Sequence, residues 1–258
     1  MAQFGDWKDL AVELGDDFVA VVEIRRAPNN FFDQALIATL ADAMAALDAD
    51  PRCRAAVLAS DGKHFCAGAN FASDVSLGAV GNHLYDEAVR LFATRTPVVA
   101  AVQGAAIGGG LGLALWPDFR VAVPDARFSA NFARLGFHHG FGLTVTLPRV
   151  VGQQRALELL YTGARIDGER AKEIGLADRL VPLERLRAEA RAFAAEIAAS
   201  GPLAIDSIRA TMRGELAAEI RAATKRERAE QERLQHTADF REGVTAMAER
   251  RTPVFRGR

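Results

Sequence analysis

Residues 97–115 read PVVAAVQGAAIGGGLGLAL, and this stretch is the most informative part of the chain about its fold. The β-branched and small apolar residues at its start are typical of a buried strand. Three consecutive glycines (108–110) and a fourth, Gly112, then open an apolar segment with helical spacing. Glycine lets a backbone approach a ligand closely, and a helix start leaves N–H groups unpaired. The pattern therefore predicts a turn that binds an anion or a developing oxyanion.

The glycine run allows two other interpretations. A dinucleotide-binding turn requires the pattern G-x-G-x-x-G, and its third glycine would fall on Leu113. Glycines that only allow close packing of a helix on a strand are a second alternative. A second loop, GKHFCAGANF (62–71), favours the oxyanion interpretation, because its Gly68-Ala69 pair can offer another backbone N–H. Two convergent donors are what an oxyanion hole requires.

Strand-like and helix-like segments alternate over the first 150 residues, which predicts an α/β architecture. The expected strands are 18–24, 55–60, 97–104 and 119–124, and the expected helices begin at the cap Asp33 and near residue 82. After residue 184 nearly everything is expected to be helical, over 184–199, 203–217, 217–236 and 239–250. The pair Gly201-Pro202 divides the prediction into a core, 1–200, and a C-terminal helical region, 201–258. We interpret the charged run 225–235 as a solvated helix face.

Composition excludes several classes of protein. The 32 basic and 33 acidic residues nearly cancel, so neither a nucleic-acid-binding surface nor an acidic tail is expected. Two cysteines exclude a disulfide scaffold, and neither belongs to a metal-binding pair. The N-terminal residues do not have the pattern of a signal peptide, and no apolar run reaches eighteen residues. We expect a cytoplasmic protein with no metal and no nucleic-acid or membrane partner.

Several long motifs, in order, resemble the crotonase superfamily, that is, the enoyl-CoA hydratase/isomerase family. The motifs are RRAPNNFFDQALIATLADAM (25–44), GKHFCAGANF (62–71), TPVVAAVQGAAIGGGLGLALWPDFRVAVPDARFS (96–129), LPRVVGQQRALELLYTGARIDGERAKEIGLADRLVP (147–182) and DFREGVTAMAERRTPVFRG (239–257). The resemblance implies a spiral core of repeated ββα turns and a C-terminal helical region that packs between subunits. It also implies a homotrimer or homohexamer that acts on acyl-CoA thioesters. Coenzyme A would enter as part of the substrate, with no tightly bound cofactor.

The resemblance also assigns residues to a binding site. The N–H groups of Ala69 and Gly109 would hold the thioester oxygen as it becomes an enolate. Gly112, Phe132 and Phe137 would line the acyl pocket. Phosphates would be bound by Arg26, or alternatively by Arg25 or Arg209. The coenzyme A path would follow Lys63, Ala67, Gly68, Asn70, Phe71 and Ala72.

This chain departs from the family pattern at its acid and base positions. The hydratases carry glutamates where this chain has Gly112 and Phe132, and the isomerases often carry an acid near Gly140. Neither glycine nor phenylalanine can transfer a proton, so two-carboxylate hydration is not expected. The candidate replacements are His139, His138 and Tyr85. A polar loop or subunit contact is the alternative role for the histidines, and core packing is the alternative for Tyr85.

Other residues near the expected site are less suitable candidates for catalysis. His83 and Asp74 are weaker candidates, and Cys66 is interpreted as packing. The predicted function is stabilisation of a thioester enolate by an enzyme of this family. Isomerisation, hydration of an unusual substrate, C–C cleavage and thioester hydrolysis remain open as its reaction. A protein that binds acyl-CoA without turnover is the alternative from another class.

Overall fold

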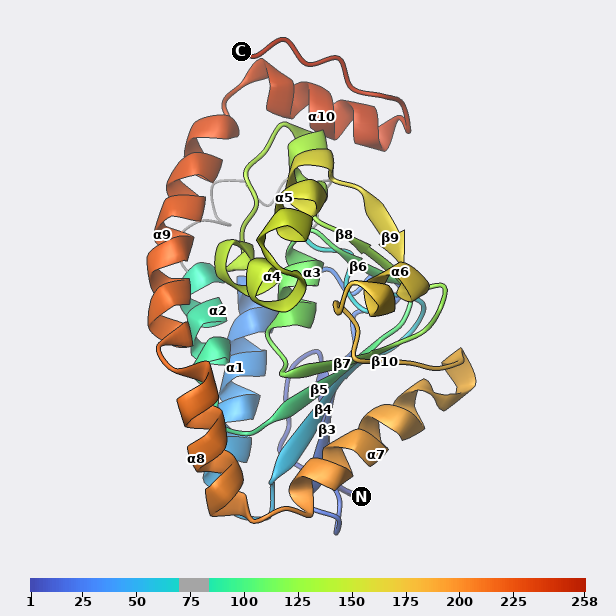
Figure 1. Cartoon of the computed structure of the whole chain (residues 1–258), viewed down its shortest axis with the longest axis vertical. Coiled ribbons are helices and arrows are strands. Elements are labelled where there is room, and N and C mark those ends of the chain that lie inside the picture. The colour runs from blue at the N-terminus through green and yellow to red at the C-terminus, as the bar shows by residue number, and fades with distance from the viewer. Residues whose placement is uncertain (70–83) are drawn as a thin grey trace.

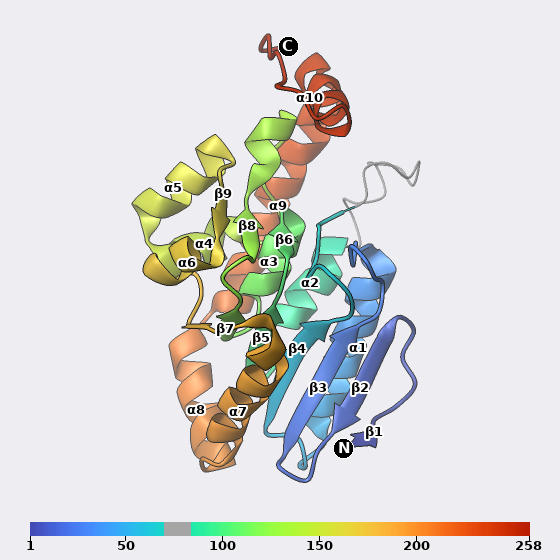
Figure 2. The same cartoon turned by 90° about the vertical axis from the view of Figure 1, so that its right-hand side faces the viewer.

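A seven-stranded sheet forms the base of the molecule in the computed structural model, which describes residues 1–69 and 84–258 (Figure 1, Figure 2). Its strands lie in the order β1-β2-β3-β4-β5-β7-β10. The pairs β1–β2 and β2–β3 are antiparallel, and the remaining neighbours are parallel. The strands are β1 Ala2–Gln3, β2 Leu10–Leu14, β3 Val19–Ile24, β4 Ala55–Ser60, β5 Val98–Val102, β7 Phe119–Ala122 and β10 Arg179–Leu180.

Helices cover both faces of this sheet. Every residue of β4 and β5 is buried, which explains why their sequences are continuously apolar rather than alternating. Helix α7 (Leu186–Ala198) packs across β3, β4, β5 and β7. Helices α1 (Gln34–Ala49) and α2 (Leu84–Phe92) lie on the opposite face (Figure 1). The apolar stripe predicted for α1 is buried and consists of Leu36, Ile37, Leu40, Met44 and Leu47.

A second, smaller sheet lies above the first and contains β6 (Ala105–Ile107), β8 (Arg127–Ser129) and β9 (Arg165–Asp167). Two isolated bridges, Cys66 to Ala106 and Phe32 to Ala69, extend this layer towards the N-terminal part of the chain. Successive turns of the chain thus place one strand in the large sheet and a short segment in the small layer. The unit β5–β6–α3, with α3 at Gly109–Leu115, is the clearest example. This arrangement agrees with the spiral of ββα turns that the family resemblance implies.

The C-terminal helices α8 (Pro202–Arg213) and α9 (Leu216–Leu234) run along one side of this core, and α10 (Ala238–Ala248) lies across its upper end (Figure 1). Helix α9 packs against α2 and α4 (Leu143–Val151), and α10 packs against the short helix η1 (Asn131–Leu135). Helix α8 buries none of its residues. The remaining helical segments are α5 Gln153–Thr162, α6 Gly168–Glu173 and η2 Leu183–Arg185. None of the helices in the described part of the chain combines the length and apolar character that a membrane crossing requires.

Most predicted elements are confirmed, and two differences are informative. Asp33 caps α1 by accepting a 2.8 Å hydrogen bond from the Leu36 N–H, as expected. Helix α4 was not predicted, because Pro148 lies within it and proline ordinarily ends a helix. The interpretation of 225–235 as a solvated face is wrong for Glu227 and Gln231. Both are buried against the core, while their neighbours on α9 are largely exposed.

The close approach of α3 to the small layer can be tested at Gly110. A Cβ at this position would collide with the carbonyl oxygen of Cys66. This oxygen belongs to the backbone, so it cannot move aside as the end of a flexible side chain could. We expect Gly110→Ala to lower the free energy of unfolding by about 1–3 kcal/mol, as overpacking of a core does. Gly201→Ala is the control, because its nearest neighbour, the Ala204 Cβ, is 3.9 Å away. Denaturant unfolding of both variants checks this, and equal midpoints would contradict the packing argument.

Candidate functional site

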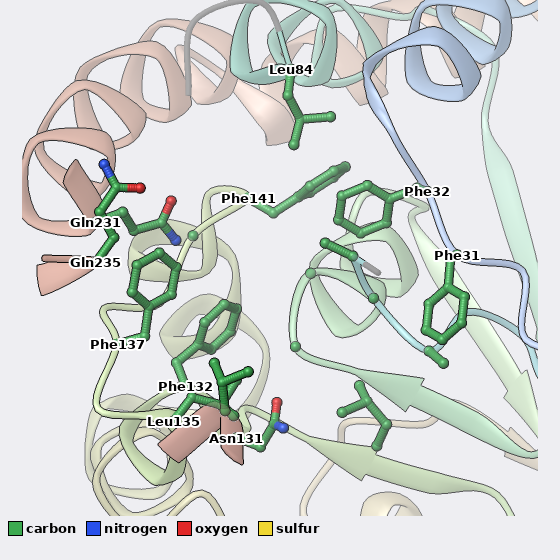
Figure 3. Close-up of a pocket in the computed structure, with 18 of the residues that line it drawn as sticks. Phe31, Phe32, Leu84, Asn131, Phe132, Leu135, Phe137, Phe141, Gln231 and Gln235 are labelled. Atoms are coloured by element: carbon green, nitrogen blue, oxygen red, sulfur yellow. The ribbon is translucent and has the colours of Figure 1, made fainter. Parts of the chain in front are cut away.

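A cavity of about 490 Å³ opens between the glycine turn, η1 and the C-terminal helices (Figure 3). Its wall is mainly apolar and includes five phenylalanine rings. The apolar side chains are Phe31, Phe32, Ala67, Ala69, Leu84, Ile107, Phe132, Leu135, Phe137, Phe141, Val244, Met247 and Ala248. The polar side chains are Tyr85, Asn131, Arg165, Arg228, Gln231, Glu232 and Gln235. A cavity of this composition suits an apolar ligand held by a few polar contacts.

The backbone N–H groups of Ala69 and Gly109 lie on the cavity wall and lack acceptors among the described residues. The loops that carry them touch. A Cβ on Gly68, whose φ is +93°, would lie 2.8 Å from the Ile107 carbonyl oxygen and 3.9 Å from the Gly109 nitrogen. The backbone pairing of Cys66 with Ala105 and Ile107 holds the loops in this position. The structure thus brings together the two small-residue loops that the sequence singled out.

The same contacts explain why glycine occupies the turn. A Cβ on Gly109 would collide with the ring of Phe32. Gly108 has φ +59°, a left-handed conformation that side chains disfavour, and its N–H donates to the Ser129 carbonyl oxygen at 2.8 Å. The packing explanation and the oxyanion explanation for these glycines are therefore compatible, since tight packing leaves the Gly109 N–H at the cavity wall.

Aromatic groups occupy the space around residues 112, 132 and 140, which the resemblance aligns with acidic residues of the family. Gly112 does not line the cavity, and a Cβ there would be 2.7 Å from the Cβ of Phe141. A Cβ on Gly140 would collide with the hydroxyl of Tyr85. Phe132 presents its ring to the cavity (Figure 3). Acidic side chains could not be introduced at 112 or 140 without displacing these neighbours.

The hydroxyl group of Tyr85 is hydrogen-bonded within the protein and is not free to bind a ligand in the cavity. Its hydroxyl donates to Gln231 Oε1 at 2.6 Å and accepts a hydrogen bond from the Phe141 N–H. Gln231 Nε2 in turn donates to the His138 carbonyl oxygen at 3.0 Å. Burial raises the pKa of the Tyr85 phenol, so it stays neutral. The arrangement fits a residue that positions the loop 137–142.

The two adjacent histidines lie outside the cavity lining. Their rings stack with centroids 4.2 Å apart, and His138 Nδ1 donates to the His139 carbonyl oxygen at 2.7 Å. His139 Nε2 is 2.9 Å from Thr144 Oγ1. The Thr144 hydroxyl proton goes to Glu227, so His139 Nε2 must be the donor to Thr144. Burial, with a smaller contribution from His138, lowers the pKa of His139 to about 4.

Glu227 is a buried carboxylate that the sequence analysis missed. It accepts hydrogen bonds from the N–H groups of Gly142 and Thr144 at 2.9 and 3.0 Å, and from the Thr144 hydroxyl at 2.6 Å. Burial raises the pKa of the Glu227 carboxyl. Together Glu227 and Gln231, one helical turn apart on α9, fasten the loop that carries Phe141. No local pattern marks either residue, because both resemble their exposed neighbours.

The residues expected to bind coenzyme A either line the cavity, lie outside the described residues, or are already held in ion pairs. Ala67 and Gly68 line the cavity, whereas Asn70, Phe71 and Ala72, like Asp74 and His83, lie outside the described residues. Arg26 is held by Asp9 at 2.7 Å and Asp33 at 2.9 Å. The two alternatives are also paired, Arg25 with Glu23 and Arg209 with Asp118.

Lys63 is an available cation on the coenzyme A path. It is exposed and makes no ion pair within the described residues. The pKa of His64 is lowered by burial and then by the positive charges of Arg127 and Lys63. The Arg127 N–H donates to the Gly104 carbonyl oxygen at 2.6 Å, and Gly104 packs against the backbone of Lys63, so the chain at Arg127 lies near Lys63. The sequence analysis missed Arg127 because the pairing of β6 with β8 brings it there. The described residues contain no group of three or more side chains placed to bind a metal ion.

Comparisons with known proteins agree over nearly the whole chain. A family model described as Enoyl-CoA hydratase/isomerase matches residues 15–258. A protein named crotonyl-CoA hydratase from Syntrophomonas wolfei is 34% identical over 251 residues, covering 93% of this chain and 95% of that protein. The crystal structure of an enoyl-CoA hydratase/isomerase from Pseudoalteromonas atlantica T6c has a TM-score of 0.87 at 30% identity, covering 96% and 100% of the two chains. This likeness confirms the predicted fold.

The surroundings of His139 predict a pH dependence of stability. The folded protein holds the pKa of His139 at about 4, against 6.5 for the ordinary value. Between these pH values the folded state binds fewer protons than the unfolded state, so the free energy of unfolding falls as the pH is lowered. We expect His139→Gln to flatten this fall. Glu227 contributes with the opposite sign, because its raised pKa favours folding at lower pH, but it is present in both proteins.

Urea unfolding from pH 7 to pH 4 measures this effect. His236→Gln is the matched control, since His236 is an exposed histidine of the same chain. An unchanged slope in His139→Gln would show that His139 is not shielded from protonation in the folded protein.

Proposed function

Because the chain belongs to the enoyl-CoA hydratase/isomerase family, we propose that it acts on the acyl group of a coenzyme A thioester. The thioester oxygen would lie between the N–H groups of Ala69 and Gly109. One observation carries this proposal: two backbone donors without acceptors sit on adjoining loops at the wall of an apolar cavity. Such donors stabilise the negative charge that collects on the oxygen when a proton leaves the neighbouring carbon.

The size of this effect allows catalysis without paired carboxylates. Removing one oxyanion-hole donor from an enzyme typically costs about 10²–10³-fold in rate, so two preorganised donors supply substantial stabilisation. Glu232 is the one carboxylate among the described lining residues, and it is paired with Arg228 at 2.7 Å. We therefore propose enolate formation as the common step, and not hydration by two acting carboxylates. The histidines and Tyr85 are proposed to position the loop that closes the pocket.

For the coenzyme A phosphates we propose Lys63 acting with Arg127, since the guanidinium of Arg26 is already held by two aspartates. The chain past Ala69 would continue the path, as the family resemblance implies. Coenzyme A would be bound only as part of the substrate. We further propose a cytoplasmic enzyme.

We also propose that copies of the chain assemble through α8. Leu203 and Met212 on this helix are 83% and 80% exposed, and Ile208 lies between them. Apolar side chains exposed on one helix are typical of a covered surface. A trimer or hexamer, as the resemblance implies, would cover them.

Deuterium exchange tests the proposed reaction. The purified protein would be incubated in deuterated water with 2-enoyl, 3-enoyl, 3-hydroxyacyl, aromatic and β-keto thioesters of coenzyme A, and the products analysed by mass spectrometry. We expect deuterium next to the carbonyl of at least one thioester, because enolate formation exchanges that proton. Thioesters that bind but return unchanged would instead favour a protein that binds acyl-CoA without turnover.

A matched set of variants tests the role of Gly109. Gly109→Ala places a Cβ against the ring of Phe32 and so displaces the N–H. We expect exchange to fall at least about 10-fold. Phe32→Leu/Gly109→Ala should recover part of the rate, because leucine lacks the ring atoms in the collision, and Phe32→Leu alone is the control. Unaltered exchange in Gly109→Ala would rule out the Gly109 N–H as an oxyanion donor.

A second set tests the phosphate contacts. Lys63→Gln and Arg127→Gln should each weaken thioester binding several-fold, and more at low salt, because exposed charge pairs are screened by ions. The rate at saturation should change little. Lys225→Gln, on exposed α9 surface, is the control. Binding constants at two salt concentrations measure the effect, and equal affinities in all three variants would reject Lys63 and Arg127 as phosphate ligands.

A further inference from the structure

We propose that the side-chain amide of Asn131 hydrogen-bonds the acyl group and makes the cavity select acyl groups that carry an oxygen close to the thioester. This inference rests on the proposed function and adds a substrate class to it. The class is acyl chains with a hydroxyl or oxo group on the carbons next to the thioester carbonyl. Asn131 is a substrate-contacting residue in this proposal and transfers no proton.

The position of Asn131 is the first support. It opens η1 directly after β8 and lines the cavity beside Phe132 (Figure 3). Asn131 Oδ1 is 3.3 Å from the point where a Cβ on Gly108 would stand. Gly108 precedes the residue whose N–H is proposed to hold the thioester oxygen. The amide is therefore at the reacting end of the cavity, next to the glycine turn.

The absence of a partner is the second support. The Asn131 side chain makes no hydrogen bond within the described residues, and Asn131 is the first residue of η1 rather than its cap, which is Ala130. An amide offers one acceptor and two donors, and rotation about its last torsion exchanges the two ends. Its hydrogen-bonding capacity is thus unused by the fold and faces the cavity.

The third support is that the other polar side chains of the cavity lining already have partners in the protein or are exposed to water. Tyr85 and Gln231 bond each other, and Arg228 is paired with Glu232. Gln235 contacts His236 at 3.4 Å from the α9 side of the cavity. Arg165 is exposed, so water satisfies its guanidinium. Asn131 is left as the described lining side chain that a ligand must satisfy at the glycine turn.

Selectivity follows from the cost of leaving this amide unpaired. A plain hydrocarbon chain that filled the cavity would remove water from Asn131 and offer it no partner. An oxygen near the thioester would accept from the amide, and a hydroxyl could also donate to it. Sites built around such a hydrogen bond reject analogues that lack the matching group. We expect the oxygenated thioester to bind about 10–100-fold more tightly than its unsubstituted counterpart.

The experiment compares two thioesters of equal chain length, octanoyl-CoA and 3-hydroxyoctanoyl-CoA, by titration calorimetry with the full chain. The variants are Asn131→Leu, which keeps the size but removes the hydrogen bonds, and Asn131→Ala. The control is Gln235→Leu, which removes an amide from the α9 side of the same cavity. We expect the preference for the hydroxy compound in the unaltered protein and in Gln235→Leu, and its loss in both Asn131 variants.

Each outcome decides a different point. Asn131→Leu should bind octanoyl-CoA at least as tightly as the unaltered protein, and this shows that the variant is folded. Equal affinities for the two thioesters in the unaltered protein, or a preference that survives in Asn131→Leu, would overturn the inference and leave the proposed function standing. Failure of the unaltered protein to bind either thioester would overturn the proposed function itself, and the selectivity with it.

Discussion

The contact between the segment 65–69 and the small sheet is the constraint on which the site depends. Cys66 donates to the Ala105 carbonyl oxygen at 2.8 Å and accepts from the Ile107 N–H at 3.1 Å. This backbone pairing brings Gly68 against Ile107 and Gly110 against Cys66, at distances that exclude a side chain on either glycine. Because the loops are fixed by backbone hydrogen bonds, the N–H groups of Ala69 and Gly109 keep their positions without a ligand. Preorganisation of this kind is what makes such donors effective.

Much of this frame could be predicted from sequence, because its signals are local. The glycine run, the capping residue Asp33 and the continuously apolar strands β4 and β5 each specify their own conformation within a few residues. Motifs in the right order then identified the family and hence the spiral arrangement. Helix α4 was not predicted, also for a local reason. Pro148 lacks a backbone N–H and ordinarily ends a helix, but α4 packs against α9 and tolerates the loss of this donor.

The loop 137–142 could not be predicted, because the groups that hold it come from far along the chain. Glu227 binds the N–H of Gly142 across 85 residues, and Gln231 binds Tyr85 across 146 residues. In the sequence both residues belong to a run of charged and amide side chains whose pattern is that of a solvated face. Only the packing of α9 against α2 and α4 distinguishes the two buried members from the exposed ones.

These distant contacts also explain why residues 112 and 140 leave no room for carboxylates. The buried network of α9 fixes Phe141 beside Gly112, where an acidic side chain would need room, and Tyr85 occupies the space beside Gly140. A charged group introduced into this apolar wall would lose its hydration without gaining a partner, a cost that neutral groups avoid. The polar functions that remain at the glycine turn are therefore uncharged: two backbone N–H groups and the amide of Asn131. In the proposed function, such a site would polarise a carbonyl oxygen and orient a substrate, and the proton that leaves the substrate carbon would pass to water.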